Sequence, residues 1–223
     1  MHRKVVLLIV AGLMAVSGMF AKTRPKPIFP YQYGRRWYIA AQAGPMFTAS
    51  ENVVSYFDNG KGWKSFTPQA SLALGYNFND AWDLRLAGNY SLNAGACAPF
   101  NGFYPYRFQT ASVFADVALN YYALGEYFPR VNPKTYLGIG MAYTFGYSEV
   151  DHPYQVVEGP NLLPGLRLGG ILEFDSPGGF GWYIDGGVEC FSDWYNGLEP
   201  DRFPIDMILK LSFGIIYHIP SAK

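Results

Sequence analysis

The chain has 223 residues, with 17 basic and 17 acidic side chains and only 15% charged residues in total, against about 25% in an ordinary soluble domain. Half of the residues are hydrophobic and 18% are Phe, Trp or Tyr, which excludes a disordered chain and favours one mostly β domain over a helix bundle. The balanced charge, without a long Lys/Arg run, excludes the electrostatic footprint that nucleic-acid binding requires.

The first 21 residues have the pattern of a signal peptide. A short basic start, from His2 to Lys4, precedes an unbroken apolar stretch from Val5 to Val16. That stretch is shorter than the roughly 20 apolar residues of a membrane-spanning helix, and no lipid-accepting cysteine follows it. We therefore expect export, with cleavage after Ala21.

Residues 22–36 form a basic, proline-rich segment. It contains three prolines and five Lys or Arg residues but no acid. Proline disfavours a helix or a central strand, so we expect an extended periplasmic lead-in. The remaining residues, 37–223, form the predicted barrel domain.

Alternating apolar and polar residues dominate the rest of the chain, a period of two that indicates β-strands. The pattern predicts about eight strands of roughly ten residues, the length of a tilted strand that crosses a bilayer. A weaker first strand is expected to be interrupted at Pro45. The expected strands cover residues 37–48, 69–78, 82–92, 110–120, 136–145, 166–174, 184–190 and 206–218.

The two faces of these strands are the reverse of those in a soluble barrel. One face carries large aliphatic residues, with aromatic side chains such as Trp82, Phe145 and Tyr217 toward the strand ends, as in the aromatic belts of membrane proteins. The other face carries small and polar residues with few charges. Because only a closed barrel satisfies every backbone group in lipid, the fold class is an all-β, transmembrane, antiparallel up-and-down β-barrel.

The connections alternate in length. Residues 49–65, 93–107, 149–163 and 193–203 are long connections, whereas 79–81 and 175–179 are short; the segment 123–134 is longer than this pattern predicts. Short periplasmic turns and long external loops are the rule for such barrels, which places both chain ends in the periplasm. The long connections are rich in Asp and Glu, so the outward-facing end is expected to be acidic.

The last strand carries the sharpest family signal. It contains Ser212, Gly214, Tyr217 and Ile219, and it resembles the assembly signal of the small bacterial outer-membrane barrels of the OmpA/OmpX-like family. The resemblance implies an outer-membrane location, contact with outer-membrane lipid, and recognition by the β-barrel assembly machinery during biogenesis. It implies no activity, because unrelated functions share this fold.

Strand parity places nine charged residues in the barrel lumen. An eight-stranded barrel is only wide enough for side chains to fill, so Arg85, Arg167 and Lys210 are expected to bridge carboxylates in a closed plug. The carboxylates outnumber the bases, so the alternative is a narrow, cation-preferring pore. The predicted lumen residues are Asp83, Arg85, Asp116, Arg167, Glu173, Asp185, Glu189, Asp206 and Lys210.

No catalytic pattern stands out, and the expected role is structural or surface-binding, through the long loops. After signal removal only His152 and His218 remain, and His152 lies in a long connection near Ser148 and Asp151. An outer-membrane lipid-modifying enzyme and a soluble barrel for a lipophilic ligand are lesser alternatives. No metal spacing or cofactor motif is present, and the sequence identifies no loop partner. Cys97 and Cys190 are expected not to form a disulfide.

Overall fold

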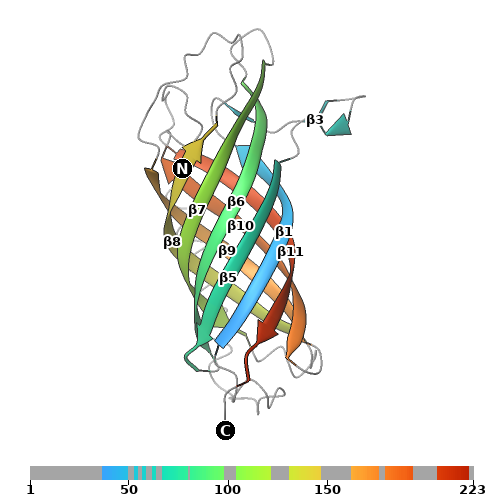
Figure 1. Cartoon of the computed structure of the whole chain (residues 1–223), viewed down its shortest axis with the longest axis vertical. Helices are drawn as coiled ribbons and strands as arrows, with labels where there is room; N and C mark the ends of the chain where they lie inside the picture. The colour runs from blue at the N-terminus through green and yellow to red at the C-terminus, as the bar shows by residue number, and fades with distance from the viewer. Residues whose placement is uncertain are drawn as a thin grey trace, which may run out of the picture.

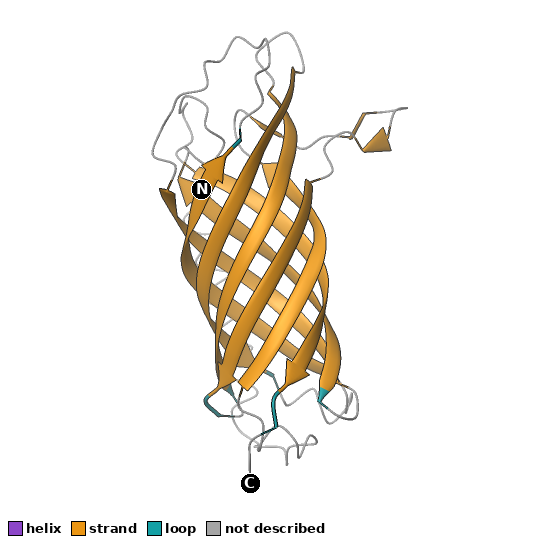
Figure 2. Ribbon diagram, in the orientation of Figure 1, coloured by secondary structure: helices purple, strands orange, loops and turns teal. Residues whose placement is uncertain are grey.

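Eight long strands make up nearly all of the part of the chain that the structure describes (Figures 1 and 2). The computed structural model describes residues 37–49, 53–54, 57–58, 62–63, 67–79, 81–97, 104–121, 131–146, 162–175, 179–192 and 205–220. The long strands are β1 (Trp37–Ala49), β5 (Thr67–Asn77), β6 (Trp82–Cys97), β7 (Tyr104–Asn120), β8 (Val131–Phe145), β9 (Leu162–Asp175), β10 (Phe180–Ser192) and β11 (Ile205–His218). Three two-residue strands, β2 (Val53–Val54), β3 (Phe57–Asp58) and β4 (Gly62–Trp63), lie between β1 and β5 in the sequence.

The long strands close into a barrel in which all neighbours are antiparallel. Each pairs with the next in chain order, and β1 pairs with β11, with Tyr38 opposite His218. Following paired residues once around the barrel from Tyr38 leads back to Thr48, ten positions further along β1. Such a stagger requires strands that are strongly tilted to the barrel axis, as Figure 1 shows. The expected closed up-and-down barrel of about eight strands is confirmed.

The outside of the barrel is apolar. Large hydrophobic side chains along every long strand face outward and are solvent-exposed, with Leu72 at 71%, Trp182 at 69% and Ile139 at 65%. About ten tilted residues of each strand make an outer band on the order of 25 Å tall, the height of a barrel's lipid-facing surface. In the part of the chain that the structure describes, no helix is long and apolar enough to cross a membrane.

Several strands extend further than the sequence pattern indicates. The expected connection 93–107 is wrong at both ends, because β6 and β7 stay paired up to Cys97 and Tyr104. The expected connection 123–134 also ends too late, because β8 begins at Val131. In both cases backbone pairing with the neighbouring strand continues where side-chain alternation has faded, since ladder hydrogen bonds do not depend on side-chain polarity.

The expected interruption of the first strand at Pro45 is wrong, because β1 is continuous from Trp37 to Ala49. Pro45 lies directly opposite Pro68 of β5. Neither proline has an N–H to donate, so each tolerates the other as a partner at that position. The effect of Pro45 falls on the other edge of β1, where the pairing with β11 omits Gly44 and Pro45.

Both ends of the barrel chain lie at the same end of the barrel as the short turns. Trp37 pairs with Tyr76 beside the β5–β6 turn, and Tyr217 pairs with Phe180 beside the β9–β10 turn. In the first turn the Asn79 side-chain oxygen accepts the backbone N–H groups of Ala81 and Trp82, at 2.8 and 2.9 Å. Figure 1 shows the end of β11 at this end of the barrel.

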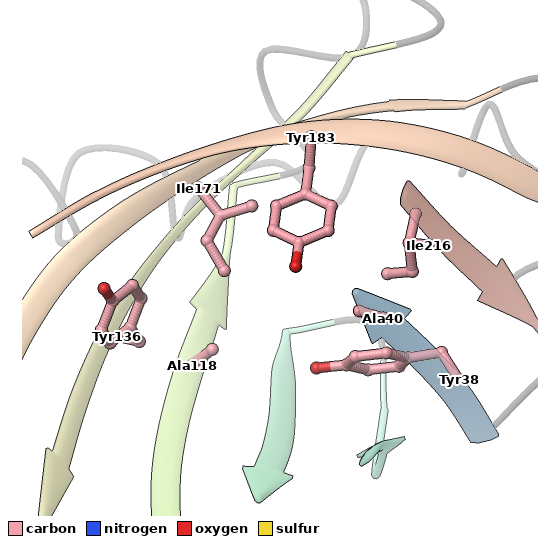
Figure 3. Packing of buried hydrophobic residues seen from close by; sticks show 7 residues of the cluster. All are labelled: Tyr38, Ala40, Ala118, Tyr136, Ile171, Tyr183 and Ile216. Carbon is pink, nitrogen blue, oxygen red and sulfur yellow. The ribbon is translucent and has the colours of Figure 1, made fainter. Parts of the chain in front are cut away.

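Inward-facing tyrosines pack against glycines on adjacent strands. Tyr38, Tyr136 and Tyr183 belong to a buried cluster that also contains Ala40, Ala118, Ile171 and Ile216 (Figure 3). A Cβ atom added to Gly75 would lie 2.0 Å from the Tyr38 ring, and one added to Gly214 would lie 2.6 Å from the Tyr183 ring. Glycine is therefore required at these inner positions because a neighbouring ring occupies the space of its side chain.

Candidate functional site: a buried charge network in the barrel lumen

All nine charged residues predicted for the lumen are buried, each at most 4% exposed as a whole residue. They come from β6, β7, β9, β10 and β11, and Lys134 of β8, which the sequence analysis did not select, joins them. The set comprises Asp83, Arg85, Asp116, Arg167, Glu173, Asp185, Glu189, Asp206 and Lys210.

Asp116 of β7 is the centre of the first ion-pair cluster. Its carboxylate accepts a hydrogen bond of 2.7 Å from Arg85 Nε and two more from the Nε and Nη2 atoms of Arg167. Arg85 also reaches Asp185 of β10 at 3.4 Å. Since β6 and β10 are not neighbours in the barrel, this contact crosses the lumen.

The same cluster continues toward β11. Lys210 Nζ lies 3.1 Å from Glu189 Oε1 and 3.9 Å from Asp185 Oδ2, and Glu189 also lies 3.6 Å from Arg167 Nη1. The Tyr136 hydroxyl donates a 2.7 Å hydrogen bond to Asp185. Three cationic side chains and three carboxylates thus form one connected group with no net formal charge.

A second cluster lies nearer the end that carries the short turns, around Lys134. Its Nζ atom lies 3.0 Å from Asp83 Oδ2 and 2.8 Å from Glu173 Oε2. The Tyr38 hydroxyl donates to Asp83 at 3.2 Å, and His218 Nε2 lies 2.6 Å from Glu173 Oε1. This cluster links strands β1, β6, β8, β9 and β11.

Lys134 and His218 are the functional residues that the sequence analysis missed. Lys134 falls within the expected connection 123–134, although it shares inward parity with Tyr136. His218 has the same parity as Lys210 but stands at the last position of β11. The predicted list contains more carboxylates than bases. Lys134 and His218 supply partners for two of these carboxylates, Asp83 and Glu173.

Aromatic rings add to the stabilisation of the buried cations. The Arg85 guanidinium lies 4.5 Å from the centre of the Tyr136 ring, and the Arg167 guanidinium lies 4.5 Å from the centre of the Phe114 ring. A guanidinium over a ring face is attracted by the ring quadrupole, most strongly where water is absent. Buried charges are tolerated only when they are paired with opposite charges or other polar partners, because removing a charge from water is costly.

The half of the lumen farther from the short turns is polar but largely uncharged. Gln69 donates to the Ser212 hydroxyl at 2.7 Å, although β1 lies between their strands. Asn93 donates to Thr110 at 2.9 Å, and Asn89 lies 3.1 Å from Ser112. Phe114 and Phe191 pack edge to face with ring centres 5.8 Å apart. Side chains therefore occupy the described lumen on both sides of the ion pairs.

Within the described residues, the geometry offers little for catalysis or metal binding. His218 is the one histidine among the described residues, and it faces Glu173 inside the barrel. His152 and its neighbours Ser148 and Asp151 lie outside the described residues. No group of three or more His, Cys, Asp or Glu side chains that could hold a metal ion occurs in the described part of the chain. Cys190 is a free thiol, and the side chain of Cys97 lies outside the described set.

The four residues of the terminal pattern occupy both faces of β11. Ser212 is fully buried, and Gly214 packs against the Tyr183 ring inside the barrel. Tyr217 lies on the outer face, with its ring centre 4.5 Å from that of Phe180. Ile219 follows the strand, and its N–H donates to the Trp37 carbonyl at 2.8 Å, which ties the residue after β11 to β1. Their role as an assembly signal stays a prediction.

Comparison with known proteins supports the fold. No protein-family model matches the sequence, and no curated protein matches it. Among solved structures, a major outer membrane protein from Thermus thermophilus matches with a TM-score of 0.50 at 14% identity, covering 82% of this chain and 99% of that one. Neisserial surface protein A (NspA) matches with a TM-score of 0.49 at 16% identity, covering 82% of this chain and 97% of that one. OprG from Pseudomonas aeruginosa matches with a TM-score of 0.49 at 12% identity, covering 83% of this chain and 98% of that one.

At such identities the likeness concerns the fold alone. The chain has the architecture of small eight-strand outer-membrane barrels, as the resemblance in the last strand predicted. A barrel of this type hosts unrelated functions, so the function must be argued from the lumen and the outer surface.

Proposed function

We propose that the protein is an integral outer-membrane β-barrel with a closed lumen, that it is not an enzyme, and that it has a structural or surface-binding role through its long connections. The observation that carries the proposal is the ion-pair network that crosses the lumen, with Asp116 bound by both Arg85 and Arg167. The outer membrane is the bilayer that accommodates closed barrels of this architecture.

The apolar outer band supports the membrane location. A soluble barrel for a lipophilic ligand buries its large hydrophobic side chains inside, whereas here they are exposed on the outside and the charges are buried. Such a surface needs lipid or detergent to remain in solution. Extraction from cell membranes only by detergent is the expected behaviour, and release by salt or alkali would contradict it.

The orientation follows from the two ends of the barrel. The strand ends next to the short connections and both ends of the barrel chain share one end, which we assign to the periplasm because such barrels have short periplasmic turns. The long, acid-rich connections are then extracellular and hold the binding surface for a partner that is still unidentified. The assembly machinery and outer-membrane lipid are the other expected partners.

The network argues against the alternative of a cation-preferring pore. In an eight-stranded barrel the interior is just wide enough for its side chains, and Arg85, Arg167 and Lys210 occupy it with their carboxylate partners. To open a path, the barrel must separate buried ion pairs, and each unpaired charge carries a large desolvation cost.

Single-channel recording of the purified barrel in planar bilayers tests the proposal. Heat-modifiable gel mobility serves as the control for folding. We expect no discrete conductance from the folded protein. Cation-selective steps that change when Glu173→Gln or Lys210→Met is introduced would establish the pore instead.

A further inference from the structure

The strand pair that closes the barrel contains a break in its ladder. β1 and β11 lie side by side (Figure 1), and their pairing stops after Ala43 and resumes at Met46 in the same register. The two intervening residues of β1, Gly44 and Pro45, are paired only with β5. Within the described residues, the other seven pairings between long strands run without such an interruption.

Pro45 accounts for this break. The Trp37 carbonyl accepts the N–H of Ile219, so the backbone groups of Trp37 face the β11 edge of β1. Backbone groups of successive residues in a strand face alternate edges, so those of Pro45, eight positions further along, face β11 as well. Because proline has no N–H, β1 lacks a donor toward β11 at this position.

At the break, the backbone of β11 lies beneath Gly44 on the lumen side. Gly44 faces inward, because its neighbours of the same parity, Gln42 and Met46, are buried. A Cβ atom added to Gly44 would collide with the Leu211 carbonyl oxygen and would lie 2.7 Å from Ser212 Cα. The peptide between these two β11 residues therefore occupies space that only a glycine leaves open.

A side-chain hydrogen bond crosses the break inside the lumen. Gln69 of β5 lies directly opposite Gly44, and the register on both sides of the break places Ser212 of β11 opposite the same glycine. Gln69 Nε2 donates to Ser212 Oγ at 2.7 Å, and both residues are at most 5% exposed. Because Gly44 has no side chain, Gln69 reaches beneath β1 and joins β5 directly to β11.

The outer face beside the break is apolar. Leu209, Leu211 and Phe213 of β11 point outward there and are exposed, as are the other large side chains of the outer band. A gap in the ladder at this depth leaves backbone groups that lipid cannot satisfy. A hydrogen bond from the lumen side is therefore the printed contact that can hold the two strands together at this position.

We propose that the hydrogen bond between Gln69 and Ser212 is a strap across the closing seam, and that the barrel wall opens first beside Gly44 and Pro45 when the strap is removed. Elsewhere along the seam, ladder pairs hold β1 and β11 together. The net contribution of one such hydrogen bond corresponds to a change of roughly two- to tenfold in the equilibrium of local opening. Ser212, which belongs to the predicted assembly signal, thus also acts in the folded barrel.

Amide hydrogen exchange of the folded full chain in detergent micelles, resolved by residue with NMR, tests the proposal. The Leu211 N–H faces β1 at the break, and the Ile215 N–H, four positions along the same edge, is the internal reference. Gln69→Met removes the donor of the strap. We expect it to speed exchange at Leu211 roughly two- to tenfold relative to Ile215.

Asn93→Leu is the matched control. It removes another buried amide donor in the same half of the lumen, where Asn93 donates to Thr110 at 2.9 Å between β6 and β7. We expect this variant to leave the ratio of the Leu211 and Ile215 exchange rates unchanged. Selective acceleration at Leu211 in Asn93→Leu would overturn the proposal, because the seam would then respond to any loss of a lumen hydrogen bond.

Pro45→Val links the strap to the break, because valine supplies the N–H that proline lacks and is favourable in a strand. In this background Gln69→Met should speed exchange at Leu211 less than it does in the wild type. Equal acceleration in both backgrounds would overturn the proposal, as would an unchanged Leu211 rate in Gln69→Met alone. Equal acceleration at Leu211 and Ile215 would also overturn it, because that result reports general destabilisation. Heat-modifiable mobility checks folding, and Ser212→Ala, which removes the acceptor, replaces Gln69→Met if the latter fails to fold.

Discussion

Arg167 of β9 and Asp116 of β7 form a two-pronged ion pair that passes over Gly138 of the intervening strand β8. A Cβ atom on Gly138 would lie 2.1 Å from an Asp116 carboxylate oxygen and 3.0 Å from Arg167 Cγ. The glycine of β8 therefore provides the space in which its two neighbouring strands exchange charges.

Replacing Asp116 by Ala is expected to destabilise the barrel strongly. The change leaves Arg167 and Arg85 without their shared carboxylate, and the loss of one partner of a buried pair costs roughly 3–5 kcal/mol. Urea unfolding in bilayer vesicles measures the effect. The double variant Asp116→Leu with Arg167→Met removes both charges and should recover part of the loss; equal stability of the single variant and the wild type would contradict the role of the pair.

Lys134→Met is expected to destabilise the barrel about as much as Asp116→Ala. It leaves Asp83 and Glu173 with no ammonium group between them, and we expect a loss of about 3–5 kcal/mol in the free energy of unfolding. Adding Glu173→Gln to Lys134→Met removes one uncompensated charge, so the double variant should be more stable than Lys134→Met alone. If the second change lowers stability further, Lys134 is not the main partner of Glu173.

Two consecutive glycines of β9 should respond oppositely to alanine. A Cβ atom on Gly169 would lie 2.3 Å from the Tyr136 hydroxyl, whereas one on Gly170 would have its nearest neighbour at 3.5 Å. Gly169→Ala should destabilise the barrel by about 1–3 kcal/mol through overpacking. Gly170→Ala should be neutral or stabilise it by up to about 1 kcal/mol. Urea unfolding compares the two, and similar effects would mean that Tyr136 moves aside freely.

A charge on the outer face should be tolerated only if that face contacts water. Leu137 is 61% exposed in the middle of β8, and Leu137→Arg is expected to cost roughly 2–4 kcal/mol in bilayers. Leu137→Ala, which keeps the site apolar, serves as the control and should cost clearly less. An arginine variant as stable as the alanine variant would argue against burial of this face in lipid.

The sequence predicted the strand set well where alternation is strong. Leu84 and Leu86 alternate with Asp83 and Arg85, and this contrast is enough to locate β6 and its two faces. It failed at the strand ends, as at Val131 and Tyr104, because there the pairing is decided by the neighbouring strand. It also missed Lys134, which lies beyond the end of the recognisable pattern.

By itself, the sequence determined the class of the protein: apolar and polar residues alternate, charges are few, and such strands are stable only as a closed barrel with its apolar face outward. Only the tertiary structure decided which side chains meet. Arg85 and Asp185 are 100 positions apart, and their contact depends on the barrel's closure and on the ten-residue stagger of its strands.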